Sequence, residues 1–323
     1  MLLVGNLLAD AQHHINSFFE DHGIVALETQ ELRDDTVITV FHRKEDVVWS
    51  RVVYSIIDMR YKQNFELYFP INPTNPKYQS LFHLTLVAIA EGNVPVYAKP
   101  ANPEDGLIPN FMQVQPLSME DIKNQLDSEG ESEDIELSPT TGDGEEGSAA
   151  NENGEPVVAT VIDNNASIYE FNNEGKLQIR DDYYKAYVPN QYKYLIQEVI
   201  FFDKHYSRLY RQIMAVAPLY TPKSTERDQP YEALYKQIVF WIPFKYLRPH
   251  MAHQHMISSK NSTKRLTFDE FFAKRLYASY LVGEDNIYDR VIPQYLRTEP
   301  ELKKEQKRIE TELLNFEQDL WEY

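Results

Sequence analysis

The sequence predicts an α+β fold with N-terminal helices, a central antiparallel sheet of hairpins and C-terminal helices, interrupted by an acidic disordered linker. Before residue 91, apolar residues recur at the three-to-four spacing of helices. After residue 156 the pattern changes to runs of β-branched and aromatic residues bounded by turn residues. The 323 residues are enough for one or two domains. We divide them into a segment 1–11, a mainly helical region 12–127, a linker 128–155 and an α+β region 156–323.

The first 11 residues raise a question of targeting. An apolar run at residues 2–8 precedes Ala9-Asp10-Ala11, which has the small-x-small form of a signal-peptidase site, with Gln12 next. However, the run is short and has no basic residue in front of it. The residues alone leave two interpretations equally open: the remnant of a secretory signal whose start codon lies upstream, and an ordinary N-terminal segment.

Two helices are predicted in the N-terminal region. In residues 45–62 the apolar positions recur at helical spacing, which predicts an amphipathic helix of about four turns. Residues 80–90 predict a second helix, which Glu91-Gly92-Asn93 ends. The remaining elements expected here are short extended pieces at residues 96–98 and 111–114 and a helix that begins at Ser118, with Asp121 three residues on, and ends near Leu126.

The linker is predicted from charge. Residues 118–155 hold 13 acidic side chains and one lysine, in a chain whose formal net charge is −18. Residues 128–155 contain few apolar side chains, so they cannot bury enough surface to offset the entropy of ordering, and we predict disorder. The acidic balance argues against nucleic acid as a partner, because phosphates would be repelled. The absence of cysteine excludes disulfides and thiolate-bound metals.

The C-terminal region is predicted to hold the sheet. Residues 157–162 and 168–171 predict one hairpin, and residues 192–202 and 208–217 predict a longer one around a turn at 203–207. Residues 235–242 predict a further strand. Adjacent antiparallel strands of this kind need a helical cover on at least one face.

Two later segments are predicted to be that cover. Residues 268–281 follow a capping box formed by Thr267 and Glu270. Residues 299–320 follow Thr298, with Glu301 three residues on. The second helix carries an apolar stripe at Ile309, Leu313, Phe316 and Leu320.

The residues give little support to catalysis. No nucleophile-elbow, dinucleotide-binding or P-loop motif is present, and no cofactor is expected. His250, His253 and His255 form the one cluster of potential metal ligands; a surface cluster is the favoured interpretation and a three-histidine metal site the alternative. The 22 tyrosines suit a binding surface, since tyrosine is enriched at interfaces. No run approaches the roughly 20 apolar residues of a membrane-spanning helix.

Specific strings resemble the GldN/PorN family of gliding-motility and type IX secretion proteins. Residues 46–53 (DVVWSRVV), followed by Ile57-Asp58-Met59-Arg60 and Leu67-Tyr68-Phe69-Pro70, resemble that family's first helix. The C-terminal half adds further strings in the family's order: residues 194–204, 214–218, Thr267-x-x-Glu270-x-Phe272, 286–290 and 319–323. Together the resemblance covers about residues 45–91 and 190–323.

The resemblance implies a non-enzymatic periplasmic protein. Members of that family assemble with a GldK/PorK-like outer-membrane lipoprotein into a ring beneath the outer membrane, and they contact the periplasmic part of a GldM/PorM-like inner-membrane protein. Self-association in the ring is implied as well. The resemblance also favours the signal-peptide interpretation, with Gln12 as the mature first residue. The alternative function is a periplasmic metal-dependent hydrolase that uses His250, His253 and His255, a cluster outside the family's pattern.

The positions of closest resemblance are our candidates for interaction or for stability of the fold. They are Trp49, Arg51, Asp58 and Arg60 on the predicted first helix, Asn286, Tyr288 and Arg290 after the sheet, and Trp321 at the end of the chain. A charged residue on an otherwise apolar element is more often in an internal ion pair than in a partner contact. That is our expectation for Asp58 and Arg60.

Overall fold

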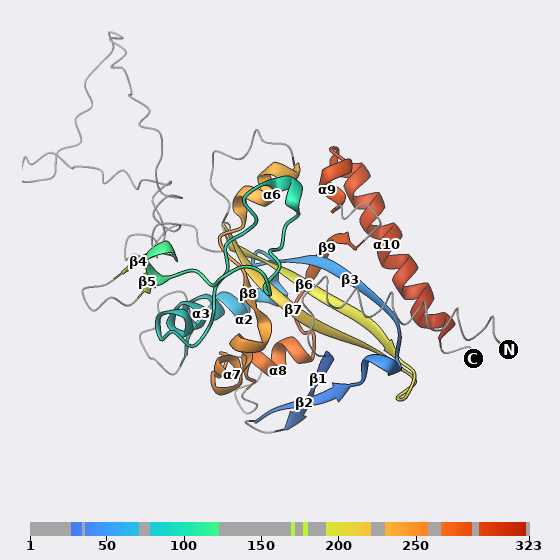
Figure 1. Ribbon diagram of the computed structural model, residues 1–323, viewed down its shortest axis with the longest axis horizontal. Coiled ribbons are helices and arrows are strands. Elements are labelled where there is room, and N and C mark those ends of the chain that lie inside the picture. Colours follow the sequence, from blue (N-terminus) through green and yellow to red (C-terminus); the bar gives the residue numbers. More distant parts are fainter. Residues whose placement is uncertain are drawn as a thin grey trace, which may run out of the picture.

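The computed structural model describes residues 27–33, 36–70, 78–122, 169–171, 177–179, 192–220, 230–257, 266–285 and 291–320 (Figure 1). Its centre is an antiparallel five-stranded sheet with helices around it, which confirms the predicted α+β class. The predicted linker at 128–155, the N-terminal segment and the strand at 157–162 lie outside the described residues. No helix in the described ranges is long and apolar enough to span a lipid bilayer.

The sheet has the strand order β8-β7-β6-β3-β9. Its strands are β3 (Val47–Asp58), β6 (Tyr192–Asp203), β7 (Arg208–Tyr220), β8 (Ile242–Pro243) and β9 (Ser279–Glu284). The β6–β7 hairpin was predicted and is confirmed, and it extends three residues further than expected at its end. Two smaller hairpins pair β1 (Leu27–Arg33) with β2 (Thr36–His42), and β4 (Tyr169–Phe171) with β5 (Leu177–Ile179).

The prediction of a helix at residues 45–62 is wrong, because this segment forms β3, the strand between β6 and β9. The apolar residues seemed helical because both faces of β3 are buried, so the alternation of a half-exposed strand is missing. Val52, Tyr54 and Ile56 pack on one face, whereas Val53 and Ile57 pack on the other. Its many β-branched and aromatic residues favour the strand.

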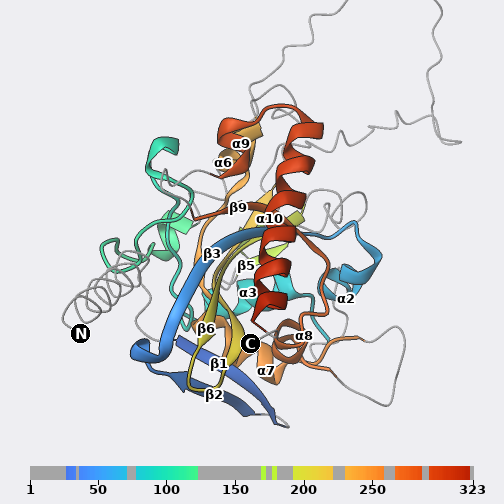
Figure 2. The same ribbon diagram turned by 90° about the vertical axis from the view of Figure 1, so that its right-hand side faces the viewer.

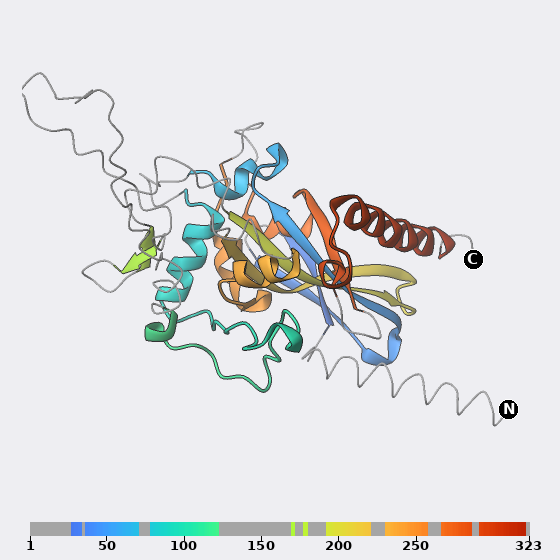
Figure 3. The same cartoon turned by 90° about the horizontal axis from the view of Figure 1, so that it is seen from above.

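Both faces of the sheet carry hydrophobic clusters. On one face, residues of β3 and β6 pack against the segment around Tyr97 and Leu107 and against α6 (Pro230–Gln237). The other face is covered in two parts, one by α3 (Leu81–Ala90), α7 (Phe244–His253) and α8 (Phe268–Ala273), and one by α10 (Glu299–Asp319). Figure 3 shows α10 and the green segment that follows α3 on opposite sides of the sheet.

Most of the predicted helices begin where expected, whereas α2 (Phe65–Tyr68), α6, α7 and α9 (Ile292–Tyr295) were not predicted. The Ser80 side chain caps α3 by accepting a hydrogen bond from the His83 backbone at 3.2 Å, and Thr267 and Glu270 form the expected capping box. Ser118 and Asp121 exchange the hydrogen bonds of a helix start, though the expected end near Leu126 lies beyond the described residues. The remaining short elements are the 3-10 turns η1 (Lys44–Asp46), η2 (Lys62–Asn64) and η3 (Pro103–Asp105).

Two other predicted elements need correction. The helix expected at 268–281 ends at Ala273, because a turn with Arg275 at φ 51° breaks it, and β9 begins at Ser279 within the predicted range. The strand expected at 235–242 begins as the last turn of α6, and only Ile238 and its successors are extended.

Only some of the short extended segments that were predicted are present among the described residues. Tyr97 does form a bridge with Trp241, but residues 111–114 form a turn. Tyr169–Phe171 is a strand as expected, yet its partner is Leu177–Ile179.

Candidate functional site

Two of the residues with the closest family resemblance, Trp49 and Arg51, lie at the contact between α10 and the sheet. Ile309 and Leu313, two members of the predicted apolar stripe, are buried and pack against Val53, Ile200 and Leu281 of three neighbouring strands. Figure 2 shows α10 crossing in front of the sheet along its length. The predicted cover helix is therefore confirmed, and its apolar stripe is what attaches it.

Trp49 lies in this contact. Its indole ring stacks on the ring of Phe316, with the centroids 4.2 Å apart and the planes at 29°. The guanidinium of Arg51 lies 5.6 Å from the Trp49 ring centroid, within the range of a cation–π interaction. The indole is thus held between a ring of α10 and a cation of its own strand.

Arg51 is the centre of an ion-pair network between β3, β9 and α10. Its guanidinium donates to Glu284 of β9 and to Glu312 of α10, both at 3.0 Å. Arg308 of α10 donates to Glu312 at 2.8 Å and to Glu284 at 3.5 Å. The hydrogen bond from Arg51 lowers the pKa of Glu312, whereas burial raises the pKa of Glu284. These ion pairs hold the solvent-exposed edge of α10 against β3 and β9.

Asp58 and Arg60 form an internal ion pair at the end of β3. The Asp58 carboxylate is 1% exposed and accepts hydrogen bonds from the Arg60 backbone, Nε and Nη2, the last at 2.6 Å. Burial tends to raise the pKa of Asp58, but the Arg60 hydrogen bonds and the charge of Lys193, 3.9 Å away, outweigh it and lower the pKa. The Arg60 side chain is 58% exposed, so its outer surface remains accessible.

The remaining candidate residues fall into two groups. Asn286, Tyr288, Arg290 and Trp321 lie outside the described residues. His250 and His253 are in the last turn of α7, and His253 Nδ1 is 2.7 Å from the Pro249 carbonyl oxygen.

No metal site joins the three histidines. Among the described residues no group of three histidine or carboxylate side chains is placed to hold a metal ion, and His255 Nδ1 is buried without a hydrogen-bond partner there. The geometry therefore gives the hydrolase alternative no support.

A buried ion pair that the sequence did not reveal joins β6 to the turn before β9. The Glu198 carboxylate is 1% exposed, and the Arg275 guanidinium donates to both of its oxygens, with Nη2 at 3.0 Å from Oε2. The Tyr277 hydroxyl donates to the same carboxylate at 3.1 Å. Arg275 occupies the left-handed region that favours glycine, so tertiary contacts hold this backbone in place. Sequence spacing offers no signal for a pair 77 residues apart.

A second such pair lies at the end of β6. His42 Nδ1 is 2.6 Å from Asp203 Oδ2, and both side chains are almost fully buried. The other Asp203 oxygen accepts from the backbone N–H groups of His205 and Tyr206, at 2.8 and 3.2 Å. Asp203 therefore fixes the β6–β7 turn and ties it to the end of β2.

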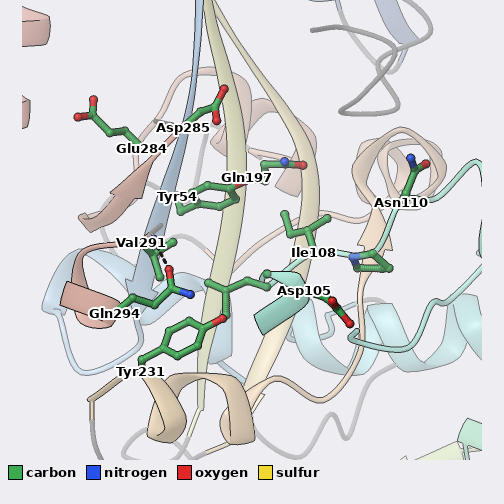
Figure 4. A pocket seen from close by; sticks show the side chains of 13 residues that line it. Tyr54, Asp105, Ile108, Asn110, Gln197, Tyr231, Glu284, Asp285, Val291 and Gln294 are labelled. Carbon is green, nitrogen blue, oxygen red and sulfur yellow. Dashed lines mark hydrogen bonds between the residues drawn. The ribbon is translucent and has the colours of Figure 1, made fainter. Parts of the chain in front are cut away.

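One cavity of about 310 Å³ lies on the face opposite α10 (Figure 4). Tyr54 and Gln197 line its floor, Tyr231 comes from α6 and Gln294 from α9, where its side-chain oxygen accepts from the Val291 backbone at 2.8 Å. Figure 4 shows the Glu284 carboxylate at the edge, directed away from Tyr54. No paired nucleophile and base converge among the described residues that line it, so it resembles a binding pocket more than a catalytic one.

The described part of the chain thus shows buried ion pairs, a helix held on the sheet by stacking and ion pairs, and exposed apolar side chains. No curated protein matches the chain. The family model described as gliding motility associated protein GldN matches residues 42–322, which include the sheet and α10. The chain therefore belongs to the GldN family and is a component of the gliding-motility and type IX secretion machinery.

Proposed function

We propose that this protein is a non-enzymatic structural subunit that assembles with a GldK/PorK-like outer-membrane lipoprotein into a periplasmic ring beneath the outer membrane. It contacts a GldM/PorM-like protein through a further surface. The observation that carries this proposal is the family match over residues 42–322, because it spans the whole described body from His42 onward. The periplasmic location and the named partners belong to the proposal.

The physical character of the fold supports a structural role. A subunit of a closed assembly has to keep its shape, because small errors of angle between neighbours accumulate around a ring. Here both faces of the central sheet are covered, and α10 is held by stacking and by ion pairs to two strands. Such a body can transmit force between partners with little change of its own shape.

The test is co-expression of this chain with the GldK/PorK-like lipoprotein of the same genome, followed by measurement of the mass of the purified material and by electron microscopy. Rings that contain both proteins are the expected result. The chain alone and the lipoprotein alone are the controls. Two proteins that purify separately, with this chain as a monomer, would refute the proposal.

The proposed contact with the GldM/PorM-like protein is tested on the same material. The purified ring is mixed with the periplasmic part of that protein, and binding is measured by sedimentation. Co-sedimentation with the ring but not with the lipoprotein alone is expected. Equal binding to the lipoprotein alone would assign the contact to the lipoprotein instead.

A further inference from the structure

One end of the sheet carries a basic and apolar surface, which we name the basic tip and define as Phe41, Arg43, Lys44, Val48, Lys204, Tyr206 and Arg208. It is formed by the connection between β2 and β3 and by the β6–β7 turn, which lie next to each other (Figure 1). The Lys204 backbone donates to the Asp46 carbonyl at 2.8 Å, which joins the two loops. The buried His42–Asp203 pair lies beneath them.

The residues of the basic tip are exposed, except Lys44, which is partly buried. Phe41 is 65% exposed, Val48 49% and Tyr206 48%, which is unusual for apolar side chains of this size. Within the described part of the chain, Arg43, Lys44 and Arg208 have no carboxylate partner, and Lys204 is 3.9 Å from Asp46. The same connection also carries the carboxylates of Glu45, which is exposed, and Asp46. Four cations and two carboxylates around three apolar side chains keep this surface positive in a chain whose formal net charge is −18, and it is a candidate contact surface.

A surface of opposite charge lies elsewhere on the molecule. Residues 100–122, which we name the acidic loop, contain four carboxylates and no lysine or arginine. Met112 is 69% exposed and Val114 41%, so this surface too has apolar side chains among its charges. Figures 1 and 2 show η3, within this loop, well apart from the basic tip.

The acidic loop is also held firmly. The Tyr231 hydroxyl donates to the Pro103 carbonyl at 2.5 Å, and Trp241 Nε1 donates to the Leu107 carbonyl at 2.8 Å. Glu104 and Glu120 are exposed. Its fixed position lets its charges contribute to specificity, because little order has to be gained on binding.

We propose that the basic tip of one copy of this protein docks on the acidic loop of the next copy. The two surfaces match in charge and both carry apolar side chains, whereas contacts of tip with tip or of loop with loop would bring like charges together. Because the contact joins different surfaces, it is heterologous and repeats from copy to copy, so it can close a ring. This inference rests on the proposed function and names the contact between neighbouring subunits within it.

The first test uses the absence of cysteine in the chain. Full-length Lys204→Cys and Glu104→Cys variants are mixed, assembled with the lipoprotein and oxidised. Cross-linked dimers are expected from the mixture, and each variant alone is expected to give few. Dimers from either variant alone at the yield of the mixture would overturn the proposal, as would a mixture that assembles without cross-linking.

The second test reverses the charges. The Arg43→Glu/Arg208→Glu variant is expected to form about tenfold less assembly, and the Glu104→Arg/Glu120→Arg variant likewise. In a mixture the two variants can alternate, so that the reversed tip of one meets the reversed loop of the other and the native tip meets the native loop. Every contact is then again between opposite charges, and the mixture is expected to recover assembly that neither variant forms alone. Lys304→Glu/Lys307→Glu on α10 makes the same change in net charge as Arg43→Glu/Arg208→Glu, away from both surfaces, and is the matched control for that variant. Circular dichroism of each variant checks that it is folded.

The outcomes separate this inference from the proposed function. If the wild-type chain and the lipoprotein do not assemble, both fall. If they assemble, but the charge reversals act no more strongly than the α10 control, only this inference falls. It also falls if reversal of the basic tip releases the lipoprotein while the copies of this chain stay associated, because the tip would then be the lipoprotein's binding surface.

Discussion

Trp49 of β3 and Phe316 of α10 stack with their ring centroids 4.2 Å apart, and this pair joins an inner strand of the sheet to the last helix described. Around it lie the ion pairs of Arg51 and the buried Ile309 and Leu313. The contact explains why residues near the two ends of the family match are part of one structural unit. Its strength decides whether α10 stays on the sheet.

Replacement of Trp49 by alanine should loosen α10. The expected loss is about 2–3 kcal/mol of unfolding free energy, somewhat less than for a fully buried aromatic side chain, since Trp49 is half-buried. Urea unfolding measures the loss, and limited proteolysis should show earlier cleavage within α10. Leu314→Ala, on the exposed side of the same helix, is the control and should change stability by less than about 0.5 kcal/mol.

The Asp58–Arg60 pair predicts a dependence of stability on pH. The folded-state pKa of Asp58 is lowered from 3.8, so its carboxylate contributes stability above that pH and loses the contribution as the pH falls through the folded-state pKa. The Asp58→Asn variant should be less stable near neutral pH and should lose less stability on acidification. Urea midpoints over an acid series measure this; parallel curves for both proteins would contradict it.

Removal of one partner of the Glu198–Arg275 ion pair should strongly reduce the free energy of unfolding. Glu198→Ala leaves the Arg275 guanidinium partly buried without its partner, and we expect a loss of about 3–5 kcal/mol. Tyr277→Phe removes one hydrogen bond to the same carboxylate and should cost about 1 kcal/mol or somewhat more. Chemical unfolding of variants replaced at Glu198, at Arg275 and at both positions gives the coupling energy between these two residues. Additive losses for Glu198 and Arg275 would mean that the two do not act as a pair.

Gly283 in β9 should resist replacement. A Cβ atom there would lie 2.7 Å from Val291 Cγ1 and 3.1 Å from the Val291 Cα, closer than atoms pack. Gly283→Ala should therefore cost about 1–3 kcal/mol, because the segment before α9 has to move outward. Val291→Ala in the same chain should recover part of this loss. Thermal unfolding of the three variants is the measurement, and an unchanged melting temperature for Gly283→Ala would disprove the close approach.

The sequence correctly predicted the elements that are determined by residues close to one another in the chain. The Thr267 capping box, the helix α3, the β6–β7 hairpin and α10 depend on residues close in sequence, and all were found where predicted. The family resemblance, which did not depend on secondary structure, was confirmed although the strand β3 had been predicted as a helix.

The predictions that were wrong concern elements whose conformation depends on contacts between residues distant in sequence. The period of β3 was ambiguous because residues from elsewhere in the chain bury both of its faces. The strands that pair with it come about 135 to 230 residues later, from Lys193 opposite Asp58 to Glu284 opposite Val53. The end of α8 is set by Arg275, whose left-handed backbone is maintained by its pairing with Glu198 in another strand. The site candidates Trp49 and Arg51 were found by resemblance, but their partners on α10 could not be inferred from spacing.

The position of β3 has a consequence for the order of folding. Its two neighbours in the sheet are β6, which begins at Tyr192, and β9, which ends at Glu284. During synthesis β3 emerges first and has no partner strand on either side until much later, and pairings of such long range form slowly. The sheet therefore closes only when nearly the whole chain is available, so the chain is suited to fold after its synthesis rather than during it.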